Sequence, residues 1–203
     1  MGLGLIGEYI KHLLEDKIGD LEVSWSWPYF FDYMTNGLML RGVWATIWLS
    51  IVSMTIGLGL GILAALMKMY GNRVVCSIAE FYIWLFRGTP ILIQLVIIYT
   101  GLPQLGIRFS VIESCIIGLA LNEGAYLAEI IRAGIMSVDK GQEDASRAVG
   151  MNWRERMWLV ILPQATRTII PPLGNQFNGM LKTTSLCSVI SMQELMRLSL
   201  IHI

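Results

Sequence analysis

Charged residues are scarce in this chain, and their signs balance. Its 203 residues include 15 Lys and Arg and 15 Asp and Glu, which leaves a formal net charge of zero. Without an excess of either sign, the composition gives no electrostatic reason to bind nucleic acid or an acidic partner. Cysteine and histidine are rarer still, with three and two residues. The cysteines lie far apart and form no CxxC pair, so we expect buried small hydrophobes and no metal or redox site.

Apolar residues, in contrast, make up 55% of the chain, and the mean hydropathy is +0.60. This composition lies outside the range of ordinary soluble domains and is typical of a membrane protein. Three stretches are long and apolar enough to cross a bilayer as helices and a fourth is weaker; they cover residues 42–67, 78–102, 109–136 and 158–181. The sequence therefore predicts an all-α, polytopic membrane protein with about four to five transmembrane helices.

Prolines and polar residues interrupt two of these spans. The second contains Arg87 and Pro90, and we expect Pro90 to kink it. The fourth is expected to be broken by its prolines and also carries polar side chains: Pro163, Pro171, Pro172, Arg167, Asn175, Gln176 and Asn178. Polar groups persist at membrane depth only where protein or a water-filled cavity covers them. The fourth span is thus expected to border a polar route, and helix–helix hydrogen bonds explain its amides equally well.

The third span contains acidic residues. At the usual helical rise Glu123 lies about 21 Å from Phe109, which is close to the middle of a membrane. Two interpretations stay open: this carboxylate faces the ammonium group of a substrate, or it pairs with a cation on another helix such as Lys182. The candidate pathway residues are Glu123, Asn175, Gln176 and Lys182. Glu129 and Arg132, three residues apart on one helix, fit a structural ion pair better.

The distribution of basic residues predicts the orientation. Residues 1–36 lack the long apolar core of a secretory signal and favour an N-terminal segment at the membrane surface, followed by a transmembrane domain over 37–203. Lys and Arg are concentrated in the connections 68–77 and 137–157, whereas the connection between the second and third spans has Arg108 alone. The positive-inside rule therefore places the two basic connections in the cytoplasm and the N-terminus outside.

The connection 137–157 has the pattern of two capped helices. Asp139 and Gln142 have the spacing of a capping box at the start of the first helix. Gly150 suits the left-handed position that ends a helix, and Asn152 with Glu155 has the pattern that starts the next.

The first of these helices has two different faces. Glu143 and Arg147 are four residues apart in the order that favours an ion pair, and Asp144 and Arg147 are three apart. The opposite face has small side chains, Ala145, Ala148 and Val149. A connection that only joins two spans needs no such double capping. We therefore predict a compact helical elbow, residues 137–157, that a cytoplasmic partner contacts.

The elbow and the residues after it resemble the cytoplasmic EAA loop of binding-protein-dependent ABC importer permeases, whose pattern is Glu-Ala-Ala, then Gly, then Ile-x-Leu-Pro. Asp144-Ala145-Ser146 occupies the Glu-Ala-Ala positions, Gly150 keeps its place, and Val160, Leu162 and Pro163 close the pattern. Other stretches are similar to the polar amino-acid branch of that family: LFRGTPILIQLVIIYTGLP (85–103), EGAYLAEIIRAGI (123–135), LPQATRTIIPPLGNQFNGMLKTTSLCSVI (162–190) and QEL (193–195). The likeness covers about residues 37–197, and several motifs that agree in order are a strong signal.

The resemblance implies a MetI-like type I permease architecture in the cell inner membrane. It implies a permease subunit of an ATP-driven importer of polar amino acids, of the histidine, glutamine, glutamate or arginine type. The implied partners are an ATP-binding cassette ATPase subunit, a second permease chain and an extracytoplasmic amino-acid-binding protein. The chain has no GxxxxGK[ST] motif, so we expect ATP and Mg²⁺ on the ATPase partner and no cofactor here. The resemblance assigns coupling to the ATPase to Asp144, Ala145, Ser146, Gly150, Leu162 and Pro163.

Two other functions compete with this one. Permeases of this family usually have one more transmembrane helix after the position of Glu194-Leu195, and this sequence stops near its beginning. A non-transporting accessory protein or a passive channel is therefore the alternative, although a channel needs no capped elbow. An intramembrane enzyme is disfavoured, because His12 and His202 lie outside the confident spans and no serine or aspartate pair matches them.

Overall fold

A computed structural model describes residues 37–192 of the chain. These residues form helices joined by short connections and contain no β-strand, which confirms the all-α prediction. The predicted interfacial segment 1–36, the QEL stretch and the question of a further helix lie outside the described residues.

Two helices confirm the first and third spans. Helix α3 covers Gly37–Tyr70 and α6 covers Val111–Met136, and both are long and apolar enough to cross a membrane. At the usual rise their lengths correspond to about 50 and about 39 Å, which exceeds the hydrocarbon core of a bilayer. Glu113 does not lie in the middle of its span: it forms a capping box with Ser110, the N-cap of α6.

The second predicted span is sharply bent. Helix α4 (Arg73–Gly88) and the next helical run, α5 (Ile91–Val96), a π-helix (Ile97–Gly101) and a 3₁₀-helix (Leu102–Leu105), meet at an angle of 104°. Thr89 and Pro90 lie at the bend with extended backbone. A proline disfavours the helical conformation of the preceding residue, so Pro90 ends α4 where we expected it only to kink a continuous span.

The bend leaves backbone carbonyl groups without helical partners, and two amide side chains donate hydrogen bonds to them. Gln94, which is 7% exposed, donates from Nε2 to the backbone oxygens of Phe86 and Thr89 at 3.0 and 3.1 Å. Asn122 of α6 donates to the same Phe86 oxygen at 2.9 Å and to Gln94 Oε1 at 3.2 Å. The bend is therefore fixed to the middle of α6 by hydrogen bonds in an otherwise apolar region.

The helix in the region of the fourth predicted span is not broken, although the sequence predicts a break there. The chain continues as α7 (Lys140–Ala148), α8 (Trp153–Glu155), a π-helix (Arg156–Ile161), α9 (Leu162–Thr183) and a 3₁₀-helix (Thr184–Ile190). The expected break at the prolines is wrong, because α9 passes through Pro171 and Pro172 without interruption. Both prolines are exposed, so the carbonyls that they leave unpaired lie on the outer side of the helix.

The number of spans stays a prediction. Within residues 37–192, two helices are apolar enough to cross a membrane alone, or three spans form if the bent pair counts as one. Helix α9 is long enough but carries too many polar residues to be included.

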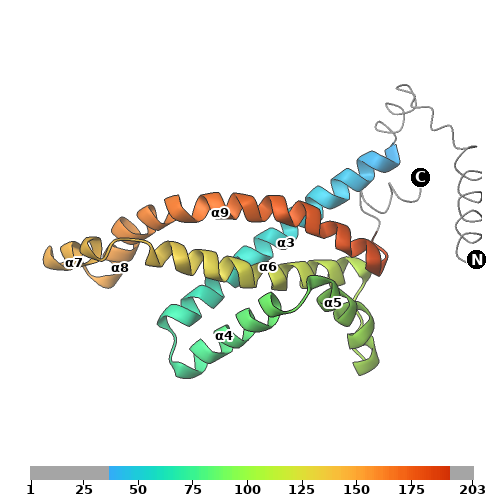
Figure 1. Cartoon of the computed structure of the whole chain (residues 1–203), viewed down its shortest axis with the longest axis horizontal. Helices are drawn as coiled ribbons and strands as arrows, with labels where there is room; N and C mark the ends of the chain where they lie inside the picture. The colour runs from blue at the N-terminus through green and yellow to red at the C-terminus, as the bar shows by residue number, and fades with distance from the viewer. Residues whose placement is uncertain (1–36, 193–203) are drawn as a thin grey trace, which may run out of the picture. The chain divides into compact units, whose positions relative to one another are not determined.

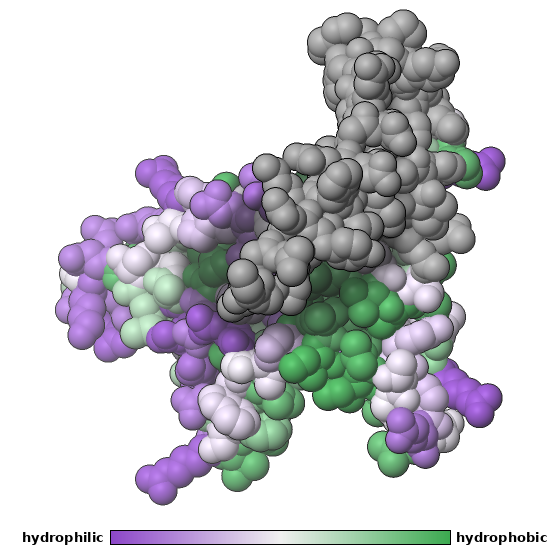
Figure 2. Space-filling view, turned by 45° about the vertical axis from the view of Figure 1, so that its right-hand side comes forward, coloured by the Kyte–Doolittle hydropathy of each residue, from purple (hydrophilic) through white to green (hydrophobic). Residues whose placement is uncertain are grey.

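Small residues bring α3 and α6 close together. A Cβ placed on Gly61 of α3 would lie 2.8 Å from the Leu127 Cβ and 3.1 Å from the Gly124 carbonyl oxygen of α6. Helix α9 lies along α6 on another side, and α7 and α8 are at the end where α6 stops and α9 begins (Figure 1). Hydrophilic residues gather at this end, whereas the middle of the visible face is largely hydrophobic (Figure 2).

Candidate coupling surface and central pocket

Local side-chain chemistry fixes the start of α7. Asp139 is its N-cap, and the Asp139 Oδ1 accepts a hydrogen bond from the Gly141 amide at 2.6 Å. The predicted reciprocal bond from Gln142 is not formed: the Gln142 Oε1 accepts a hydrogen bond from Gln164 of α9 at 3.3 Å. The predicted ion pair is confirmed, with Arg147 Nη2 at 2.6 Å from Glu143 Oε1. Asp139 thus caps the helix alone, and Gln142 attaches α7 to α9.

The end of α7 is a Schellman motif around Gly150. The Gly150 amide donates to the Arg147 carbonyl at 3.0 Å, and the Met151 amide donates to the Ser146 carbonyl at 3.1 Å. Gly150 has φ +81°, which confirms the left-handed conformation that the sequence predicted. Since an L side chain rarely adopts this backbone conformation, glycine is required here for its dihedral angle.

The second half of the elbow runs directly into α9. Asn152 and Glu155 form the predicted capping box, with hydrogen bonds of 3.0 and 2.9 Å. From Trp153 to Thr183 the backbone is helical without interruption, first α, then π, then α again. The π-helix ends two residues before Pro163, which has no N–H for a regular helical bond. The second half of the elbow and α9 are thus one continuous helical element, whereas the turn at Gly150 separates α7 from it.

The coupling residues assigned from the sequence divide into exposed and inward-facing groups. Asp144, Ala145, Gly150 and Pro163 are exposed, Leu162 is half-buried, and Ser146 is buried. The Ser146 hydroxyl donates to the Glu143 carbonyl at 2.7 Å, so this side chain stabilises α7 itself. Val149, at the end of the small-residue face, is 73% exposed. Within the described chain, the Ala145–Gly150 face is therefore open to a partner.

A separate pocket of about 220 Å³ lies among α5, α6 and α9. Two of the predicted pathway residues meet there: Gln176 of α9 donates from Nε2 to Glu123 Oε2 at 3.4 Å. Glu123 is 5% exposed, and its Oε1 has no hydrogen-bond partner in the described residues. A Cβ added to Gly57 of α3 would lie 3.1 Å from the Glu123 Cβ, so α3 holds this side chain from behind.

The other two pathway candidates are not brought to this pocket. Asn175 and Lys182 are exposed on α9 and do not line it. Gln176, and not Lys182, is the hydrogen-bond donor to Glu123 among the described residues. Sequence reasoning did not assign Asn122 and Tyr126, which also line the pocket. Both residues lie within one helical turn of Glu123, and this spacing is the feature of the sequence that could have identified them.

The ion pair predicted near the end of α6 is confirmed and has a third member. Arg132 Nη2 lies 2.8 Å from Glu129 Oε2, and Lys68 Nζ of α3 lies 2.7 Å from Glu129 Oε1. All three side chains are less than one third exposed. This cluster ties the end of α3 to α6 beside the elbow.

Comparison with known proteins gives consistent results. Residues 57–201 match the family model of the binding-protein-dependent transport system inner membrane component. The chain is 42% identical over 182 residues to the arginine transport system permease protein ArgU of Corynebacterium glutamicum, a match that covers 82% of this chain and 57% of that protein. It is 41% identical over 160 residues to the arginine transport system permease protein ArtQ of Bacillus subtilis, covering 78% of this chain and 73% of the relative.

A solved structure agrees with the sequence matches. The crystal structure of an amino acid ABC transporter with histidines superposes with a TM-score of 0.81 at 40% identity, and the match covers 88% of this chain and 83% of that one. The part of the chain that matches the family model includes both the elbow and the central pocket. The chain is a membrane protein and belongs to the family of binding-protein-dependent transport system inner membrane components.

Proposed function

We propose that this chain is the permease subunit of an ATP-driven importer of polar amino acids. One observation carries the proposal: the second half of the elbow, from Trp153 on, continues without a break into the helix that supplies Gln176 to the Glu123 pocket. The first half, α7, is attached to the same helix by the hydrogen bond from Gln164 to Gln142, so a force applied at α7 can reach the buried polar site through α9. The relatives named as arginine permeases support the substrate class.

The partners follow from the same arrangement. An ATPase subunit that carries ATP and Mg²⁺ contacts the face from Asp144 to Gly150, in the cytoplasm. A second permease chain completes the pathway, and a binding protein delivers the substrate on the opposite side, where the N-terminus lies. The chain is placed in the inner membrane, with 68–77 and 137–157 on the cytoplasmic side.

The unpaired carboxylate oxygen of Glu123 supports a substrate that carries a cationic group. A buried carboxylate needs hydrogen-bond donors or a positive charge, and Gln176 supplies one donor at 3.4 Å to the other oxygen. A substrate ammonium or guanidinium group would satisfy Oε1. Glu123 and Gln176 are therefore proposed to contact the substrate, whereas Asn175 and Lys182 are proposed to border the route on the exposed side of α9.

The coupling assignment is tested by Gly150→Val in the assembled transporter. Valine is strained at φ +81°, so the end of α7 must rearrange and the ATPase contact is expected to weaken. Gly106→Val is the matched control, because Gly106 also has positive φ (+87°) but precedes α6 at its other end. ATPase co-purification and ATP-dependent uptake are measured for both variants. Equal loss in both, or full uptake with Gly150→Val, would overturn the assignment.

The substrate assignment is tested by Glu123→Gln in the same system. Radiolabelled uptake is measured for a panel of cationic and neutral polar amino acids. Removal of the negative charge is expected to reduce uptake of cationic substrates by about tenfold or more and to affect neutral ones less. A uniform effect across the panel contradicts the proposed contact with a cationic group.

A further inference from the structure

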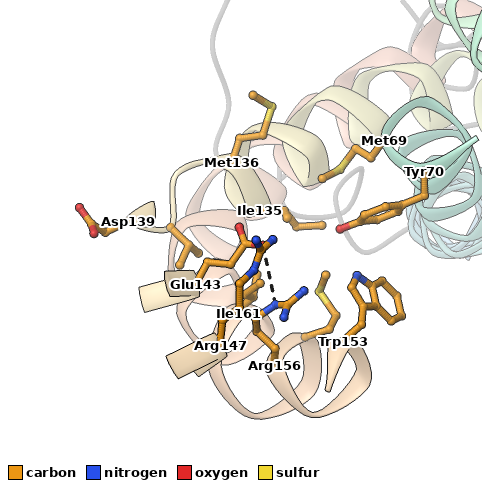
Figure 3. Close-up of a pocket in the computed structure, with 12 residues that line it drawn as sticks. Met69, Tyr70, Ile135, Met136, Asp139, Glu143, Arg147, Trp153, Arg156 and Ile161 are labelled. Carbon is orange, nitrogen blue, oxygen red and sulfur yellow. Dashed lines mark hydrogen bonds and ion pairs between the residues drawn. The ribbon is translucent and has the colours of Figure 1, made fainter. Parts of the chain in front are cut away.

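A second pocket, of about 340 Å³, lies beside the elbow and is distinct from the Glu123 pocket. It is formed by the ends of α3 and α6 together with α7, α8 and the following π-helix. Charged and aromatic side chains converge on it, among them Tyr70, Glu143, Arg147, Trp153 and Arg156 (Figure 3). Asp139 also borders the pocket, but its side chain points away from this cluster (Figure 3).

Among the charged members of this cluster, Arg156 has the longest ion pair. Its side chain is only 12% exposed, and its one ion pair is with Glu143, at 3.7 Å from Nε to Oε1. The same Glu143 oxygen already accepts a hydrogen bond from Arg147 at 2.6 Å. Within residues 37–192 the guanidinium of Arg156 donates no hydrogen bond, although it has five N–H groups. None of its nitrogen atoms is among the fully buried polar atoms without a partner, so the free donors face the pocket, where an acceptor can reach them.

The rim of the pocket has the composition of a protein interface. Trp153 and Tyr70 pack edge to face, with ring centroids 5.6 Å apart, and remain 50% and 48% exposed. Met136 across the pocket is 65% exposed. Tryptophan, tyrosine, methionine and arginine are the residue types enriched at protein interfaces, where apolar rims keep water from central charged contacts.

We propose that this pocket receives an acidic side chain of the ATPase subunit, whose carboxylate pairs with Arg156. The inference rests on the proposed function, because it assumes that an ATPase contacts the elbow. A carboxylate matches the planar fork of a guanidinium, and the aromatic rim covers the pair. The pocket borders the same α7 whose Ala145–Gly150 face is exposed, so one partner reaches both. Contact at two points holds the elbow more firmly than contact at α7 alone.

The test compares Arg156→Gln with Arg154→Gln. Arg154 lies two residues away on the same helical run, is exposed and does not line the pocket. The affinity of purified permease for the ATPase subunit isolated with the wild-type complex is measured in detergent at several salt concentrations. Arg156→Gln is expected to weaken binding about 30-fold or more and to flatten its salt dependence. Arg154→Gln is expected to change it less than about threefold.

Two further measurements separate this contact from a structural role. Because Arg156 has, among the described residues, only the long ion pair with Glu143 in the free permease, Arg156→Gln is expected to leave the thermal unfolding temperature nearly unchanged, and a clearly lowered value overturns the proposal. Arg156→Lys keeps the charge but loses the planar fork, so intermediate binding is expected.

The remaining outcomes show whether something other than the ATPase side chain occupies this pocket. If inorganic phosphate alone stabilises the wild-type permease but not Arg156→Gln, and ATPase binding is equal in both, the pocket binds a free anion and the proposal is wrong. If Gly150→Val loses the ATPase while Arg156→Gln retains it fully, this inference fails and the proposed function stands. A wild-type permease that binds no ATPase refutes both.

Discussion

The close contact between α3 and α6 makes Gly61 a sensitive position. Gly61 is buried, and a Cβ added there would lie 2.8 Å from the Leu127 Cβ and 3.1 Å from both the Ala128 amide nitrogen and the Gly124 carbonyl oxygen. Real Cβ atoms essentially never approach other atoms to less than 3.0 Å. Two of the three neighbours are backbone atoms, so no side chain can rotate to make room. Gly61→Ala therefore requires α3 and α6 to separate.

Gly59 on the same helix provides a matched control. It is exposed, and no atom lies within 4 Å of a Cβ added there. Both substitutions gain the helix propensity of alanine, up to about 1 kcal/mol, so this contribution cancels in the comparison. Overpacking of a well-packed interface costs about 1–3 kcal/mol. We therefore expect Gly61→Ala to be less stable than Gly59→Ala by about 1–3 kcal/mol, a factor of roughly 5 to 150 in the folded-to-unfolded ratio.

The assay is equilibrium unfolding of the purified chain in mild-detergent micelles, titrated with a denaturing detergent and followed by tryptophan fluorescence. The free energies of unfolding of both variants are compared with that of the wild type. Equal stability of the two variants would refute the tight contact between these helices. A destabilised Gly59→Ala would show instead that this surface of α3 is not open in the unfolding conditions.

Three further substitutions probe contacts of the same bundle in this assay. Glu129→Gln removes the partner of Lys68 and Arg132, and we expect a loss of about 1–3 kcal/mol, with the exposed Glu80→Gln unchanged as control. Tyr82→Phe deletes the hydroxyl that donates to the Leu121 carbonyl at 2.7 Å, with an expected cost of about 1–2 kcal/mol; wild-type stability would contradict this hydrogen bond. Gln94→Leu keeps the side-chain volume but removes the donor to Phe86 and Thr89 at the bend, so a loss of about 1–3 kcal/mol is expected, and no loss would show that the bend is held by other contacts.

Features determined by neighbouring residues were predictable from the sequence. The cap at Asn152 and the left-handed Gly150 depend on backbone groups within three or four residues, so their pattern is visible in the chain itself. The spans α3 and α6 were predictable because long apolar runs have few alternatives in a bilayer. The ion pair of Glu129 with Arg132 follows from their spacing on one helix.

Features that depend on distant residues were not predictable in the same way. Gln176 and Glu123 are 53 positions apart, and Lys68 and Glu129 are 61 apart. The sequence contains no direct signal that brings either pair together. The size of the bend at Pro90 also depends on Gln94 and Asn122, which satisfy the carbonyls that a sharp turn exposes. Proline alone indicates where a helix is weakened, and its surroundings determine whether the helix ends, as at Pro90, or continues, as at Pro171.

The position of Pro163 relates the elbow to the central pocket. Two π-helices occur in the described residues, and each ends two residues before a proline: Ile97–Gly101 before Pro103, and Arg156–Ile161 before Pro163. A π-helix changes the helical register by one residue and accommodates the missing N–H without breaking the helix. The change of register at Pro163 sets which faces of α8 and α9 align.

A movement that couples the elbow to the central pocket depends on how α8 and α9 are aligned. The helix rises about 20 Å from Pro163 to Gln176. A small tilt of this helix at the elbow therefore displaces Gln176 at the pocket. The Gln176–Glu123 hydrogen bond, at 3.4 Å, is long and therefore weak. Near the elbow, α9 is attached to α6 by Ser137 and Thr168, whose hydroxyls are 3.3 Å apart. For the proposed importer we therefore predict that a tilt of α9 about that attachment lengthens the Gln176–Glu123 hydrogen bond.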